Sequence, residues 1–275
     1  MEVIIKDVVD IVKPTGLVLA ASKIKEDSLL GLLYKDTLQP SVQSLGVALG
    51  NIMEFCTTPF LLCKFGSEVA KENFKKHLDN YAKKLESIPE NEKIHVNPQI
   101  GVPLLDRLTY TTNDEIAELF IKLLTRASAT STVNSAHPAF IQIIDRLTPD
   151  EAKILVYLQD KKHVPFVGLE SKEQSARQYH PVRNHQTCLS FDLLLDFPEN
   201  VPTYIDNLES VGVLELQSTI VLTDTKIYDR LYEIYKYDDL EDDVKQQLAF
   251  TDMKRLKGTF KVTDFGQLFI VACTR

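Results

Sequence analysis

Three side chains of the kind that bind transition metals stand close together in the sequence: His180, His185 and Cys188. Their spacing, H-x4-H-x2-C, offers two imidazole nitrogens and one thiolate. A structural zinc site needs four ligands in known pairings, and no fourth ligand stands nearby in the chain. We therefore interpret these residues as part of an irregular segment, 163–199, and expect neither a metal nor any other cofactor.

Two further motifs resemble parts of enzymes. His137 could act as a general base, since histidine titrates near neutrality, but its place just before Pro138 is typical of a helix start. Asp264, Phe265 and Gly266 spell the metal-binding triplet of protein kinases, yet the other kinase motifs are absent. The chain also lacks a Gly-rich phosphate loop and a G-x-S-x-G elbow. No catalytic residue is predicted.

The charge of the chain argues against nucleic acid as a partner. The formal net charge is −8. Residues 1–147 carry 16 Lys and Arg against 18 Asp and Glu, and residues 148–275 carry 15 against 21. Binding to nucleic acid depends on basic side chains that neutralise phosphates, so neither half suits that partner.

The segment 45–63, LGVALGNIMEFCTTPFLLC, is the nearest approach to a membrane span. Asn51, Glu54 and Pro59 interrupt it, so it falls short of the roughly 20 apolar residues that a spanning helix needs. We interpret it as a buried helix and keep membrane contact as the alternative. The four cysteines form no C-x2-C pair, and the start of the chain lacks the apolar core of a signal peptide. A cytoplasmic location is therefore expected.

Residues 1–147 are predicted to form a helical domain. Short helices are expected at 2–13 and after His137, and a capping box at 112–115 indicates another that starts from Thr112. The clearest helix covers 67–88, where one apolar seam is formed by Phe74, Leu78, Tyr81, Leu85 and Ile88. Residues 89–105, with three prolines, are predicted to be an extended connector.

Residues 148–275 mix helical and strand-like periods. A second capping box, Thr148 to Glu151, starts a helix over 150–162. The later segments are a helix that passes through Gly212 into a strand (204–216), two β-prone stretches (219–223 and 258–262) and a final helix (263–273). This is the order of a winged-helix-like module with an inserted helical segment around 224–249. The predicted fold is mainly α: an N-terminal helical region, then a winged-helix-like α+β module.

The reading helix of such a module would lie at about 202–212, and here it contains Asp206 and Glu209 but no Lys or Arg. Contact with DNA is built from basic side chains, so an acidic helix favours a protein partner. An apolar face that starts at Ile205 and recurs every third residue is expected to pack inward. The predicted partner-binding residues, on the outward side or at its boundary, are Tyr204, Asp206, Asn207 and Glu209.

Three stretches of the chain, taken in this order, resemble the bacterial abortive-infection alpha (Abi-alpha) family. They are LYKDTLQPSVQSLGVALGNIM (33–53), HPAFIQIIDRLTPDEAKIL (137–155), and the pair YIDNLESVGVLEL (204–216) with GTFKVTDFGQLFIVAC (258–273). The resemblance spans about residues 30–275. It implies a bacterial protein associated with defence against bacteriophage, and it carries over no catalytic residues.

We therefore expect a non-enzymatic interaction or sensor protein of antiphage defence, with a phage or host protein as its partner and homo-oligomerisation left open. Two alternatives stay open. One is an effector that engages the membrane through 45–63, which an exposed apolar hairpin there would favour. The other is an enzyme whose site is scattered through the fold, which a buried pocket with convergent ionisable side chains would favour.

Overall fold

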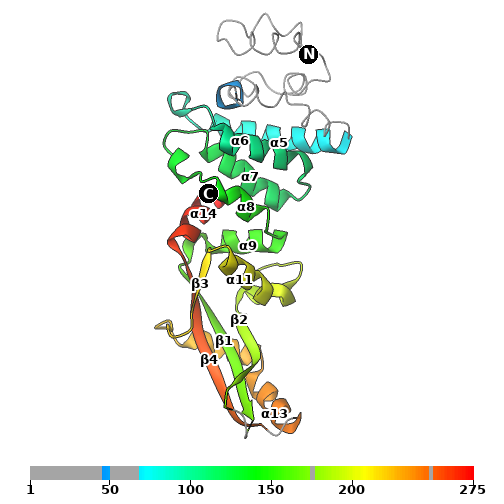
Figure 1. The fold of residues 1–275 in the computed structure, drawn as a ribbon, viewed down its shortest axis with the longest axis vertical. Coiled ribbons are helices and arrows are strands. Elements are labelled where there is room, and N and C mark those ends of the chain that lie inside the picture. The colour runs from blue at the N-terminus through cyan, green and yellow to red at the C-terminus, as the bar shows by residue number, and fades with distance from the viewer. Residues whose placement is uncertain (1–44, 50–67, 174–176, 248–249) are drawn as a thin grey trace, which may run out of the picture. The chain divides into compact units, whose positions relative to one another are not determined.

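The computed structural model describes residues 45–49, 68–173, 177–247 and 250–275 (Figure 1). The described chain is mainly helical, with one small four-stranded antiparallel sheet. It forms two compact units: the described residues up to Pro149 together with Val271–Arg275, and Asp150–Ile270. The division expected between residues 147 and 148 assigns the last residues to the second domain, whereas Val271–Arg275 belongs to the first unit.

The helix predicted at 2–13 lies outside the described residues. So does the apolar segment 45–63 except for residues 45–49, which are helical and contribute the buried side chains of Leu45, Ala48 and Leu49. No helix in the described part of the chain is both long and apolar enough to cross a membrane.

The first unit is built from helices that pack on one another (Figure 1). They are α5 (Glu68–Glu86), the 3-10 turn η1 (Glu90–Glu92), α6 (Pro98–Tyr110), α7 (Asp114–Arg126), the 3-10 turn η2 (Val133–Ser135) and α8 (Ala139–Ile144). The apolar seam predicted for 67–88 is confirmed, because Phe74, Leu78, Tyr81 and Leu85 are buried. Ile88 lies beyond the end of α5 and is half-buried.

The prediction of an extended connector at 89–105 is wrong, because α6 begins inside it. Asn97 caps this helix by accepting a hydrogen bond from the Gln99 amide at 2.9 Å, and Pro98 occupies the first turn, where no amide hydrogen is needed. Pro103 costs the helix interior one hydrogen bond. The burial of Leu104, Leu105 and Leu108 offsets that loss.

The other helix starts of this unit differ from the prediction by a residue or less. Asn113, not Thr112, caps α7 by accepting from the Ile116 amide at 3.0 Å. His137 serves as predicted at the start of α8, where its Nδ1 accepts a hydrogen bond from the Ala139 amide at 3.1 Å. The helix expected after His137 is confirmed as α8, and its apolar side chains are buried: Phe140, Ile141, Ile143 and Ile144.

The second unit combines the sheet with short helices. Its elements are α9 (Pro149–Tyr157), η3 (Leu158–Asp160), β1 (His163–Glu173), β2 (His180–Thr187), α10 (Leu189–Asp192), η4 (Pro198–Asn200), α11 (Val201–Ser210), β3 (Leu214–Gln217), α12 (Lys226–Ile234), α13 (Tyr237–Gln247), β4 (Phe250–Val262) and α14 (Asp264–Thr274). The strands lie in the order β2-β1-β4-β3, and α14 ends in the first unit.

The prediction that residues 163–199 are irregular with short helices is wrong for the part that forms β1 and β2, whereas a short helix, α10, does follow. Pro165 and Gly168 weaken the strand signal of β1. Pro165 is tolerated because the pairing of β1 with β2 starts only at Phe166, so at Pro165 the strand is paired with β4 alone. The register with β4, a segment almost 90 residues further along the chain, runs from His163↔Lys261 to Glu173↔Phe250.

The passage from α11 into β3 is confirmed. Gly212 lies between them with φ of +78°, a conformation that glycine adopts without the strain other residues suffer. The stretch 258–262 belongs to β4 as predicted, whereas 219–223 is not a strand. The final helix is also confirmed, and Thr263 caps it by accepting a hydrogen bond from the Gly266 amide at 2.8 Å.

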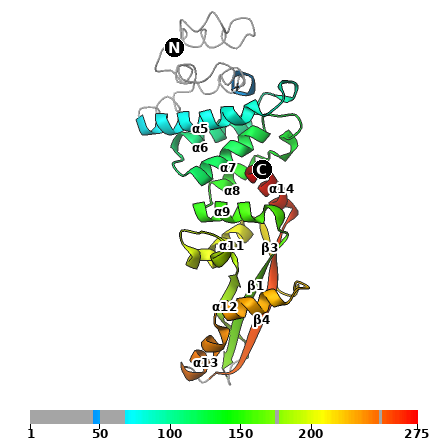
Figure 2. The ribbon, with the colours of Figure 1, turned by 180° about the vertical axis from the view of Figure 1, so that it is seen from behind.

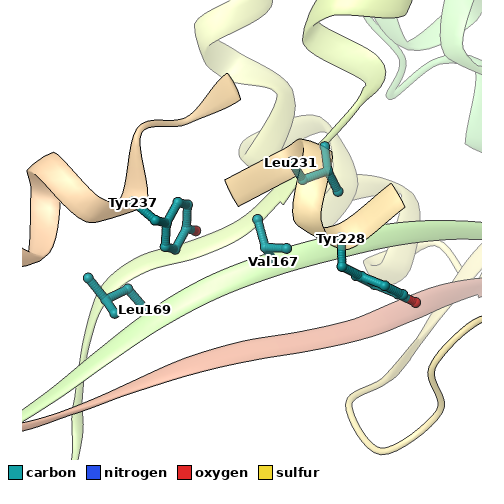
Figure 3. Close-up of a cluster of buried hydrophobic side chains, with 5 residues drawn as sticks. All are labelled: Val167, Leu169, Tyr228, Leu231 and Tyr237. Carbon is teal, nitrogen blue, oxygen red and sulfur yellow. The ribbon is translucent and has the colours of Figure 1, made fainter. Parts of the chain in front are cut away.

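The helices predicted between the last two strands are α12 and α13, which pack against β1 and β4 (Figure 2). Figure 3 shows how they are held: Tyr228, Leu231 and Tyr237 lie against Val167 and Leu169 of β1. All five side chains are buried, so this part of the sheet has an apolar core of its own.

Candidate functional site

A buried carboxylate joins the start of α9 to the segment that leads into α11. Asp150 is only 2% exposed. Its Oδ1 accepts hydrogen bonds from the Asp196 amide at 2.8 Å and from Lys153 Nζ at 3.2 Å, and its Oδ2 accepts from the Phe197 amide at 2.9 Å and from the Tyr204 hydroxyl at 3.1 Å. Burial alone would raise the pKa of Asp150, but these four donors outweigh it and lower the pKa. The carboxylate therefore stays ionised and holds the polypeptide around it.

This network changes the picture of the four predicted partner-binding residues. The prediction that Tyr204 faces outward is wrong, because Tyr204 is buried and donates to Asp150. Asn207 Nδ2 donates to buried Glu151 Oε1 at 2.6 Å, and Glu209 Oε1 accepts from the Leu216 amide at 3.2 Å. Asp206 is exposed. A binding role for the set stays a prediction, and Asp206 is its most accessible member.

A pocket of about 260 Å³ lies beside the first turn of α11. Its walls come from β2, α10, η4, α11 and the residue after α12. They include His185, Thr187, Ser190, Phe191, Glu199 and Tyr235. The Tyr235 hydroxyl donates to the Thr187 carbonyl at 2.8 Å, and its ring meets Phe191 in an edge-to-face contact with 5.2 Å between centroids. These contacts hold the aromatic wall in place.

Two hydroxyl groups of the pocket, those of Ser190 and Tyr235, are hydrogen-bonded to each other. Because Tyr235 gives its single hydroxyl proton to Thr187, Ser190 is the donor in the 2.7 Å hydrogen bond between the two hydroxyls. Burial raises the pKa of Tyr235, and its bond to Ser190 offsets only part of that rise. A neutral phenol cannot remove a proton from Ser190, so this pair has no means of activating the serine.

His185 forms another wall and is also held in a neutral state. Its ring makes edge contacts with Phe166 and Phe260, with centroid separations of 4.9 and 5.1 Å. Burial lowers the pKa of His185, while the nearby carboxylates of Asp206 and Glu209 oppose that change. The outer carboxylates of α11 therefore act electrostatically on this pocket.

The other two candidate metal ligands have different surroundings. His180 is exposed on β2. Cys188 starts α10, and its Sγ lies 3.7 Å from the Tyr157 hydroxyl; burial raises the pKa of this thiol. Within the described ranges, no group of three or more His, Cys, Asp or Glu side chains is arranged to hold a metal ion.

Sequence reasoning missed the exposed apolar side chains in α10 and in the segment that follows it. Phe191 is 53% exposed, Leu194 95% and Phe197 57%. The sequence signal for them was the run FDLLLDF, which is apolar but too short and too interrupted by Asp to form a core helix. A second missed signal is that no Lys or Arg occurs between Arg183 and Lys226, although seven Asp and Glu do.

Comparisons with known proteins bear on identity. No curated protein matches the chain. Among solved structures, an uncharacterized protein from the hydrocarbon-degrading marine bacterium Alcanivorax borkumensis SK2 is similar over 54% of this chain and 99% of its own, with 13% identity and a TM-score of 0.36. A likeness this weak carries neither fold nor function to this chain.

The family comparison is more informative. The model of the family described as abortive infection alpha matches residues 67–273. This match runs from the start of α5 almost to the end of α14 and so takes in elements of both units. The resemblance drawn from the sequence is thereby confirmed, and the chain belongs to the abortive infection alpha family.

Proposed function

We propose that this protein acts in abortive-infection defence against bacteriophage by binding another protein through what we name the α10–α11 surface. This surface consists of three exposed apolar side chains, Phe191, Leu194 and Phe197, and two exposed carboxylates, Glu199 and Asp206. The observation that carries the proposal is the exposure of the apolar group. Contiguous apolar residues with a polar rim are typical of sites that bind a partner.

Two features support a binding role over catalysis at this place. The pocket beside the surface, at about 260 Å³, is below the roughly 300–1,000 Å³ of ordinary ligand and cofactor sites. Its serine and tyrosine hydroxyls are hydrogen-bonded to each other, and the tyrosine donates to a backbone carbonyl. A protein partner needs only a surface that is complementary in shape and charge. The apolar side chains and the carboxylates of the α10–α11 surface offer both kinds of contact.

The architecture of the second unit supports the same use. We propose that it is a winged-helix-like module in which β1, β4 and β3 form the three-stranded sheet, and in which β2 and the helices α12 and α13 are insertions. On this interpretation α11 takes the place of the reading helix. Its acidic character fits a protein partner better than phosphate. The free thiols of Cys188 and Cys273 fit a role in the reducing cytoplasm.

The test is protection of bacteria that express the full chain. We expect the double variant Leu194→Ser/Phe197→Ser to lose protection, so that plaque counts rise to those of cells without the protein. The matched control is Val156→Ser/Ile220→Ser, because those side chains lie in the same unit and are 51% and 47% exposed. Circular dichroism melting establishes that both variants fold. Full protection by a folded Leu194→Ser/Phe197→Ser protein would exclude this surface.

A further inference from the structure

We propose that the segment which the α10–α11 surface recognises is a basic stretch of a partner protein whose apolar side chain enters the 260 Å³ pocket. This inference rests on the proposed function, because it names the chemistry of the partner at the same surface. It has two parts, an apolar anchor and a positive charge, and separate observations carry each part.

The apolar anchor follows from the pocket and its rim. The two hydroxyls of the wall are already satisfied, since Tyr235 donates to Thr187 and Ser190 donates to Tyr235. A ligand therefore gains little from polar groups here and more from covering the aromatic rings. Phe191 lines the pocket and is 53% exposed, so a side chain that enters the pocket also covers this ring. Such a buried apolar anchor is the usual centre of a protein interface.

The positive charge follows from the composition around the pocket. Between Arg183 and Lys226 the chain has seven acidic residues and no Lys or Arg. Among the outer carboxylates, Asp196 is paired with Lys153 and Asp192 accepts a hydrogen bond from Tyr157.

Glu199 and Asp206 are among the carboxylates left without such a partner. Glu199 lines the pocket, Asp206 acts electrostatically on His185 in its wall, and neither forms an ion pair with any described residue. His185 does not compensate them, because burial keeps its pKa low. A positively charged partner would supply the missing counter-charge.

The same charges argue against other occupants. Anionic lipid and nucleic acid would be repelled by Glu199 and Asp206. A small metal cation would need convergent ligands, and the described residues hold no such group. Basic side chains spaced along a peptide can reach both carboxylates while an apolar side chain fills the pocket.

The experiment titrates the full-length protein with three fluorescein-labelled, amidated twelve-residue peptides. The first has leucines at helical i, i+3, i+4 and i+7 spacing with lysines between them. In the second, serine replaces leucine; in the third, glutamate replaces lysine. We expect the Leu/Lys peptide to bind, and the other two to bind at least about tenfold more weakly, which is about 1.4 kcal/mol.

A charge reversal locates the binding. The double variant Glu199→Lys/Asp206→Lys should bind the Leu/Lys peptide about tenfold more weakly, or weaker still, than the unchanged protein does. The matched control is Glu233→Lys/Asp243→Lys, which reverses two exposed carboxylates on α12 and α13 and should change binding by less than about twofold. Equal weakening in the two double variants would overturn the inference, and so would equally tight binding of the Glu/Leu peptide.

Two further outcomes separate the inference from the proposed function. If no peptide binds while Leu194→Ser/Phe197→Ser still abolishes protection, the basic partner is wrong and the proposed function stands. If the Leu/Lys peptide binds as expected but the double variant Leu194→Ser/Phe197→Ser still protects fully, the partner chemistry stands and the proposed function fails. Binding to phosphatidylcholine–phosphatidylglycerol vesicles that is lost in Leu194→Ser would assign the surface to membrane and overturn the inference.

Discussion

At the scale of single residues, Asp150 decides what its neighbours can do. Its four donors come from a lysine three residues further along α9, from two backbone amides and from Tyr204. A tyrosine near a buried carboxylate is more useful as a donor than as a surface ring, because an unpaired buried charge is expensive. The residue type alone does not reveal this, since it depends on which helix packs against which.

The first prediction concerns this hydroxyl. Tyr204→Phe should lower the free energy of unfolding by about 1–2 kcal/mol at pH 7, because a hydrogen bond to a charged group is lost. The hydrogen bonds hold the pKa of Asp150 below its ordinary value of 3.8. The stability from the ionised carboxylate is therefore complete above that value and is lost as the pH falls through the folded pKa.

Urea unfolding of both proteins from pH 8 to pH 3 checks this. The difference between them should be constant down to about pH 5 and should shrink below about pH 4. Tyr179→Phe is the control, because Tyr179 donates to Asp252 at an exposed site and should cost less than about 0.5 kcal/mol. A Tyr204→Phe cost that does not change with pH would contradict the assignment.

At the scale of elements, the sequence predicted the helices well and the strands poorly. The seam of α5 and the apolar faces of α7 and α8 are local patterns, so they can be read without the rest of the fold. Strands β1 and β2 could not be predicted this way. Pro165 and Gly168 interrupt the local pattern, and the pairing that stabilises β1 comes from Phe250–Val262.

The pocket was unpredictable for the same reason. Its walls come from residues 185–202 and from Tyr235, and only the packing of α10 on Tyr235 brings them together. The resemblance to the abortive infection alpha family could be found because it depends on sequence order. The run FDLLLDF marks Leu194 and Phe197 as poor candidates for a core helix, but their exposure depends on how the neighbouring elements pack.

The second prediction concerns the contact between α14 and β3. A Cβ at Gly266 would lie 2.2 Å from the carbonyl oxygen of Val213, and backbone cannot yield as a flexible side chain does. Gly266→Ala should therefore cost about 3 kcal/mol or more. Gly46→Ala is the control, since no described residue lies within 4 Å of a Cβ at this position and alanine favours a helix by up to about 1 kcal/mol. Thermal melting of the two variants and of the unchanged protein is the measurement. A Gly266→Ala protein that melts at the same temperature as the Gly46→Ala protein would disprove the close contact.

At the scale of the whole molecule, the third prediction follows from the net negative charge of the chain. We expect no strong binding to duplex DNA, because the chain has a net charge of −8 and α11 has no Lys or Arg. The basic residue Arg255 on β4 is already paired with Asp238 and Glu241. Gel-shift titration of the full chain at low salt is the measurement. Submicromolar binding that weakens steeply with added salt would show that phosphate contacts exist after all.

The return of Val271–Arg275 to the first unit has a consequence for biosynthesis. Ala272 and Cys273 are fully buried there, and Lys122 donates to the Thr274 carbonyl. A ribosome makes residues 45–149 first and these core residues only after all of Asp150–Ile270. During translation the first unit therefore waits, with part of its apolar interior open, until a unit of 121 residues has emerged. The first unit therefore gains these buried residues only after the second unit has been made.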